Sequence, residues 1–64
     1  MRPTEQILLN GRPAPLVETV RDLVPDPVGR AVAVNGDVVP RAEHATRRLR
    51  PGDVVDVVTA VQGG

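Results

Sequence analysis

The sequence contains no cysteine, no lysine and none of the aromatic residues Phe, Tyr and Trp. Without cysteine it forms neither disulfides nor thiolate metal sites, and the single histidine, His44, does not assemble a metal site by itself. Without aromatic side chains the core must be Val, Leu, Ile and Ala, and stacking platforms for nucleic-acid bases are excluded. Without lysine no side-chain amine is present to which another chain could be joined.

The charge balance and the length of the chain limit the classes of protein to which it can belong. Eight arginines balance eight acidic residues, whereas a protein whose main task is to grip nucleic acid is usually strongly basic. The 64 residues make one small domain, residues 1–64. The sequence shows no hydrophobic run of spanning length, signal-peptide layout or lipidation motif. We therefore expect a cytoplasmic protein that binds neither nucleic acid nor membrane and is a monomer when free.

An Asn-Gly pair, Asn10-Gly11, separates two apolar runs in the first third of the chain. Both central residues of a type I′ turn need a positive φ, so Asn-Gly between apolar runs indicates a β-hairpin. The pattern predicts strands at Gln6–Leu9 and Pro13–Leu16. The prolines of the second strand are typical of a sheet edge.

A short helix is predicted next. Thr19 followed three residues later by Asp22 resembles a capping box. The apolar residues of Val20–Val24 are spaced i, i+3 and i+4, which is one face of a helix, and Pro25 and Pro27 end it. We expect about two helical turns packed on a sheet.

The second half of the chain repeats the hairpin signature. A strand at Ala31–Val34, a turn at Asn35-Gly36 and a short strand at Val38–Val39 are predicted. The polar stretch 41–49 indicates a turn or a single helical turn, and Arg50–Asp53 (RPGD) indicates another turn.

The run VVDVVTAV, residues 54–61, is the longest β-branched stretch and the strongest strand prediction. A strand this apolar is expected at the centre of the sheet. The predicted order is β-β-α-β-β-β, an α+β fold with a mixed sheet of about five strands and one short helix on one face, which is the β-grasp arrangement.

Three segments resemble the ThiS family of sulfur carriers, which have the ubiquitin-like β-grasp fold. They are VAVNGDVVPR at Val32–Arg41, LRPGD at Leu49–Asp53, and TAVQGG at Thr59–Gly64. ILLNGRP and ETVRDLV add a weaker resemblance in the first hairpin and helix. The chain departs from the family in a shorter stretch after Thr19 and in His44, where members often carry an aromatic residue.

The resemblance implies that the functional group is the α-carboxylate of Gly64, preceded by Gly63. An E1-like adenylating enzyme (ThiF) would activate it with ATP and Mg²⁺, neither of which this chain is expected to bind itself. A persulfide sulfur donor would convert the acyl-adenylate to a thiocarboxylate. The thiocarboxylate would pass its sulfur to thiazole synthase (ThiG) in thiamin biosynthesis. The chain would then be a protein cosubstrate rather than an enzyme.

Residue chemistry near the diglycine is compatible with this role. The stretch Gln62–Gly64 spans about 10 Å when extended, and glycine, which lacks Cβ, fits a narrow channel. If Val55 and Val57 face the helix, alternation places Val58 and Ala60 on the open face of the sheet. Each of these residues is equally well explained as an ordinary β-former. The residues expected to contact partner enzymes are Val58, Ala60, Val61, Gln62 and Arg41.

Two alternatives stay open at the level of sequence. A chain with the same fold could supply sulfur to molybdopterin or to an amino-acid pathway, or could modify other proteins through Gly64. A chain of another class could be an S4-like RNA-binding module, because residues 32–58 also resemble its hairpin region, with Arg47, Arg48 and Arg50 on phosphates. S4 domains have two helices before that hairpin, whereas this sequence predicts a hairpin and one helix.

Overall fold

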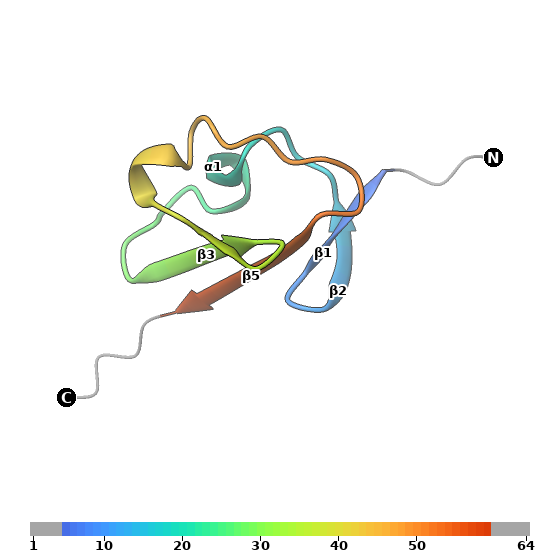
Figure 1. The fold of residues 1–64 in the computed structure, drawn as a ribbon, viewed down its shortest axis with the longest axis horizontal. Helices are drawn as coiled ribbons and strands as arrows, with labels where there is room; N and C mark the ends of the chain where they lie inside the picture. Colours follow the sequence, from blue (N-terminus) through green and yellow to red (C-terminus); the bar gives the residue numbers. More distant parts are fainter. Residues whose placement is uncertain (1–4, 60–64) are drawn as a thin grey trace.

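The computed structural model describes residues 5–59. The elements follow the chain as β1 (Gln6–Leu9), β2 (Arg12–Pro15), α1 (Val20–Leu23), β3 (Arg30–Val34), β4 (Asp37–Val39), the 3₁₀ turn η1 (Arg41–Glu43) and β5 (Val54–Thr59). The strands form one mixed sheet in the order β2-β1-β5-β3-β4, and α1 and η1 lie on the same side of it (Figure 1). The predicted α+β fold with the β-grasp arrangement is confirmed.

Both hairpins turn on their Asn-Gly pairs, as predicted. Asn10 and Gly11 have φ of 51° and 82°, and Asn35 and Gly36 have φ of 52° and 87°. The second strand begins one residue earlier than expected, because a two-residue turn pairs Leu9 directly with Arg12. This strand, β2, lies at the sheet edge, as its prolines indicated.

The last strand, β5, lies at the centre of the sheet. It pairs parallel with β1 through Leu8↔Val54 and Leu9↔Val55, and antiparallel with β3 along five residue pairs from Arg30↔Thr59 to Val34↔Val55. The central position predicted from its β-branched composition is confirmed. On each face of the sheet, the side chains of β5 therefore lie between those of β1 and those of β3.

The helix α1 begins as predicted but is shorter. Thr19 caps it: its Oγ1 accepts from the Asp22 N–H at 3.3 Å, and the Asp22 carboxylate accepts from the Thr19 N–H at 3.1 Å. The expectation of two turns is wrong, because α1 makes only one. Val24 leaves the helix at φ −128°, since a residue before a proline is sterically excluded from the helical region and Pro25 follows.

The core lies between the sheet and the segment that carries α1 and η1. Its buried hydrophobic residues are aliphatic, as the composition required: Ile7, Val20, Val24, Val32, Val34, Val39, Leu49 and Val55. The polar stretch 41–49 contains the single 3₁₀ turn expected of it. Backbone N–H groups of α1 join it to this stretch, with Arg21 donating to the His44 carbonyl at 2.8 Å.

Candidate functional site

The strand that leads toward the diglycine is held on both of its edges. β5 ends at Thr59, five positions before Gly64 in the sequence. Its first residues pair with β1 on one side, and residues Val55 to Thr59 pair with β3 on the other. Of the predicted site residues, Ala60, Val61, Gln62, Gly63 and Gly64 lie outside the described residues.

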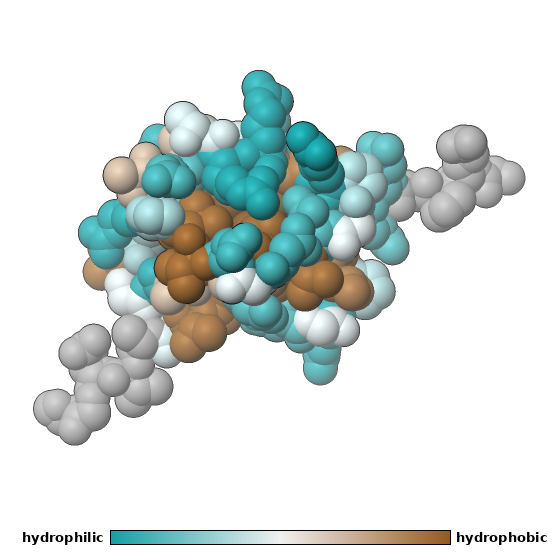
Figure 2. Space-filling view, viewed as in Figure 1, coloured by the Kyte–Doolittle hydropathy of each residue, from teal (hydrophilic) through white to brown (hydrophobic). Residues whose placement is uncertain are grey.

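The sheet face opposite α1 is mostly apolar. Alternation along the strands, with Ile7, Val32 and Val55 buried on the covered face, assigns their neighbours to the other face. We call this the open face, and its central members are Leu8, Pro13, Ala31, Ala33, Val38, Val54, Asp56 and Val58. Figure 2, in which α1 lies above the sheet as in Figure 1, shows the molecule from the side, with apolar side chains at the surface in the region of β3, β4 and β5.

The register divides the open face into rows. Leu8 lies between Pro13 and Val54 in one row, and Val58 lies beside Ala31 in another. Between them, Ala33 is paired with Asp56, the acidic member of the face. An apolar area of this kind, interrupted by one charge, is suited to contact with another protein.

Val58 lies where the sequence placed it, since its side chain is 61% exposed on the open face. Arg41 is also exposed, but it lies in η1 and lines a pocket beside α1, on the other side of the sheet. The structure therefore does not bring these two predicted contact residues together. Periodicity found Val58 because it belongs to the one long strand run. Leu8 and Val38 were missed because only strand pairing reveals that they share its face, whereas alternation along the same run could have placed Val54 there.

The arginines named for phosphate contact do come together. Arg47, Arg48 and Arg50 line a hollow of about 310 Å³ at the start of β5, with Asn35 and Asp53. Two carboxylates lie close to these arginines. Asp53 lines the hollow, and Glu18 pairs with Arg48 at 3.0 Å. A hairpin and one helix precede this region instead of two helices, so the S4-like arrangement is not present in residues 5–59.

Asp53 is the acidic group at this hollow whose ionisation the structure alters. Partial burial by itself raises the pKa of its carboxyl. Burial is the largest single effect, but the opposing effects outweigh it together: the Arg50 N–H donates to the carboxylate at 2.8 Å, the Asn35 amide donates at 3.0 Å, and the Arg47 and Arg50 charges are near. The net result is a pKa below the usual value for aspartate.

Within residues 5–59, no group of three or more His, Cys, Asp or Glu side chains is arranged to hold a metal ion. No helix in this part of the chain is long and apolar enough to cross a membrane.

Comparison with known proteins extends over nearly the whole chain. The model of the ThiS family matches residues 4–64. The chain belongs to the ThiS family. A curated relative from Thermus thermophilus, named sulfur carrier protein ThiS, is 38% identical over 63 residues, covering 91% of this chain and 98% of the relative.

A solved structure agrees with this assignment. The crystal structure of the thiamine biosynthesis protein ThiS from Geobacter metallireducens superposes with a TM-score of 0.75 at 25% identity, covering 92% of this chain and 99% of that one. The resemblance found in the sequence is thus confirmed. Membership of the ThiS family makes the chain a sulfur carrier rather than a catalyst.

Proposed function

We propose that this member of the ThiS family carries sulfur in thiamin biosynthesis as a thiocarboxylate on Gly64. The observation that carries the proposal is the family match, which runs through residue 64 and so includes Gly63-Gly64. The name of the Geobacter relative, a thiamine biosynthesis protein, supports thiazole formation as the destination of the sulfur. A cytoplasmic location is part of this proposal.

The chemistry needs an activated carboxylate. A free carboxylate resists nucleophiles, because its charge is delocalised and oxide is a poor leaving group. In the proposed route, an oxygen of the Gly64 carboxylate attacks the α-phosphorus of ATP, and pyrophosphate leaves. Persulfide sulfur then attacks the acyl carbon and releases AMP. A thiol cleaves the resulting S–S bond, which leaves the thiocarboxylate on Gly64. In this proposal the ATP and Mg²⁺ belong to the adenylating partner, a ThiF-like enzyme.

The described structure supports docking through the open face. Val58 stands on this face one residue before the end of β5, and Leu8 and Val54 continue the apolar surface toward β1. A partner that binds this face fixes the position of β5, and with it the point from which residues 60–64 start, relative to its own active site. Five residues of extended chain reach about 17 Å beyond Thr59. That length allows a carboxylate to enter an active site below the partner's surface, and the docking contact offsets the entropy lost when the glycines are ordered.

The direct test is mass spectrometry of the C-terminal tryptic peptide, Leu49–Gly64. The full chain is incubated with a ThiF-like enzyme, ATP, Mg²⁺ and a persulfide donor, with ATP omitted in the control. We expect a mass gain equal to replacement of one oxygen by sulfur, which deletion of Gly64 abolishes. The peptide contains no Met, so oxidation does not imitate the gain.

The outcome also separates the alternatives. If the thiolated chain supports thiazole formation by a ThiG-type synthase, the thiamin assignment stands. If the thiocarboxylate forms and the synthase does not consume it, the carrier serves another client, such as molybdopterin or an amino acid. If an adenylating enzyme active on a known ThiS protein produces no adenylate on this chain, the carrier proposal itself is wrong.

A further inference from the structure

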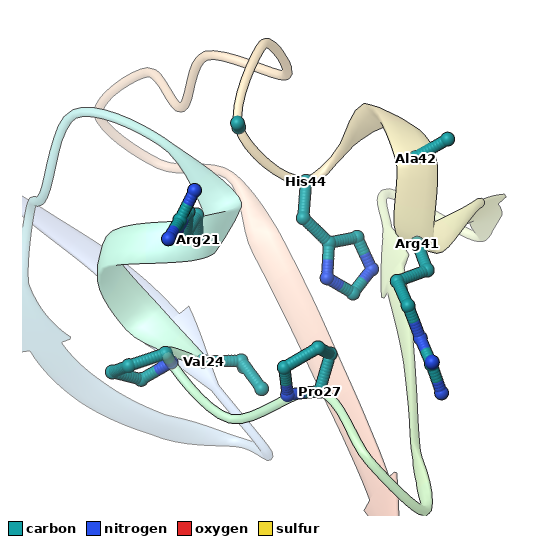
Figure 3. A pocket seen from close by; sticks show the side chains of 8 residues that line it. Arg21, Val24, Pro27, Arg41, Ala42 and His44 are labelled. Atoms are coloured by element: carbon teal, nitrogen blue, oxygen red, sulfur yellow. The ribbon is translucent and has the colours of Figure 1, made fainter.

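A second candidate site lies on the covered side of the sheet. The end of α1 and the η1 segment enclose a pocket of about 310 Å³. Figure 3 shows the His44 imidazole projecting into the space between α1, which carries Arg21, and η1, which carries Arg41. The remaining lining residues are Val24, two prolines and two alanines, and none of the lining residues is acidic.

The His44 ring is buried, and one of its two nitrogens has a hydrogen-bond partner within residues 5–59. The side chain is 5% exposed, and its Nε2 lies 3.1 Å from the Val39 carbonyl oxygen. A carbonyl only accepts, so Nε2 carries a proton, and the tautomer with a single proton presents a lone pair at Nδ1. Nδ1 is buried and has no hydrogen-bond partner among the described residues. A buried polar atom without a partner is unfavourable, so Nδ1 is available to a hydrogen-bond donor that enters the pocket.

Two cations lie on the rim of the pocket. Arg21 and Arg41 are exposed, and within residues 5–59 the one ion pair is that between Arg48 and Glu18. The pocket therefore combines two positively charged hydrogen-bond donors, the Arg21 and Arg41 guanidinium groups, with one buried acceptor, His44 Nδ1. A ligand that satisfies all three must carry negative charge and donate a hydrogen bond as well.

We propose that this pocket binds inorganic phosphate. At neutral pH orthophosphate keeps at least one P–OH group, which donates to His44 Nδ1, while its charged oxygens accept from Arg21 and Arg41. A carboxylate offers acceptors only and leaves Nδ1 unpaired. Sulfate has a similar size and charge but no proton at neutral pH, so the pocket discriminates against it. The site is separate from the chemistry of Gly64 and does not depend on it.

Entry of the anion involves the loop between α1 and β3. Nδ1 has essentially no surface open to water, so the pocket wall must yield before an oxygen reaches it. The loop that supplies Pro25 and Pro27 to this wall has short-range hydrogen bonds: Val28 N–H to the Asp26 carboxylate at 3.2 Å, and Arg30 N–H to the Pro27 carbonyl at 3.0 Å. A segment tied by local bonds moves at small cost. Phosphate binding is therefore expected to shift the Val28 amide signal.

The test is a titration of the ¹⁵N-labelled full chain by NMR at pH 7.5, with sodium phosphate, sodium sulfate and sodium acetate as probes and sodium chloride holding the ionic strength constant. Phosphate is expected to shift the His44 Nδ1 resonance and the Val28 amide along saturating curves, with a Kd in the millimolar range. Sulfate and acetate are expected to bind at least about tenfold more weakly, a factor that corresponds to one lost hydrogen bond.

Paired variants distinguish a built site from a generally positive surface. The double variant R21Q/R41Q removes both rim charges, and R12Q/R50Q removes two exposed charges elsewhere. We expect at least about a tenfold loss of phosphate affinity in the first pair and less than about twofold in the second. Equal binding of sulfate, equal effects of the two double variants, or shifts that never saturate would each overturn the proposal.

Discussion

The side-chain oxygen of Asn10 accepts a hydrogen bond from the backbone N–H of Val57, 2.8 Å away and 47 positions along the chain. The Asn10 N–H donates in turn to the Val55 carbonyl at 2.9 Å. β1 pairs with β5 only as far as Leu9↔Val55, so Asn10 continues the ladder by one step after β1 has turned into the hairpin. One residue thus forms the turn and secures the strand that leads to the diglycine.

Removing this amide should weaken the junction of β1 with β5. Gly tolerates the positive φ of Asn10, so N10G keeps the turn and deletes the hydrogen bond, whereas N10D keeps an acceptor oxygen. We expect N10G to lower the free energy of unfolding by about 1 kcal/mol, and N10D by less. Urea unfolding followed by far-ultraviolet circular dichroism measures the loss. Faster hydrogen exchange of the Val57 amide in N10G would place the loss of stability at this hydrogen bond. Unchanged exchange there would contradict the role of Asn10 as its acceptor.

Acidification should destabilise the fold through Asp53. The pKa of its carboxyl is lowered in the folded state, so the ionised form contributes stability above the unfolded-state pKa. That contribution decreases as the pH falls from about 5, where unfolded carboxyls begin to take up protons, through the lower folded pKa. Stability of the D53N variant, measured by urea unfolding between pH 2.5 and 7, should fall less over this window. Parallel curves for D53N and the unchanged chain would exclude Asp53 as the cause.

The capping box should contribute measurably to stability, because it begins the single turn of α1. T19A removes the Oγ1 acceptor of the Asp22 N–H, and T19S keeps it. We expect T19A to cost about 1 kcal/mol, which in a domain of this size lowers Tm by about 4–8 °C. T19S should stay close to the unchanged chain. Thermal unfolding by circular dichroism compares them, and equal losses in both variants would mean that the hydroxyl does not act as the cap.

A charge on the open face should impair activation without impairing folding. Val58 and Val28 are 61% and 71% exposed, but Val58 lies on the open face and Val28 in the loop between α1 and β3. For V58D we expect at least about a tenfold lower kcat/KM for ATP-dependent adenylation by a ThiF-like enzyme, and little change for V28D. Both variants should unfold within about 0.5 kcal/mol of the unchanged chain. If both variants are adenylated normally, the open face is not where the partner docks.

Much of the local structure follows from the sequence, because its causes are local. Asn-Gly supplies the positive φ of each turn, and Thr19 with Asp22 begins the helix within four residues. The β-branched run at the end of the chain indicates the central strand. The length of α1 was overestimated, although the steric effect of Pro25 on Val24 is itself local and readable from the sequence. The family match confirms the resemblance that these short segments carried.

Other features depend on contacts between distant residues, and only the tertiary structure decided them. The open face takes its composition from strand register, which brings Leu8 beside Val54 and Ala31 beside Val58. A shift of one residue would place the other half of each strand on that face, because strand side chains alternate with period two. His44 gives no periodic signal within its polar stretch, yet it is buried because α1 and η1 pack around it. Its unpaired Nδ1, the basis of the phosphate proposal, is therefore a property of the fold.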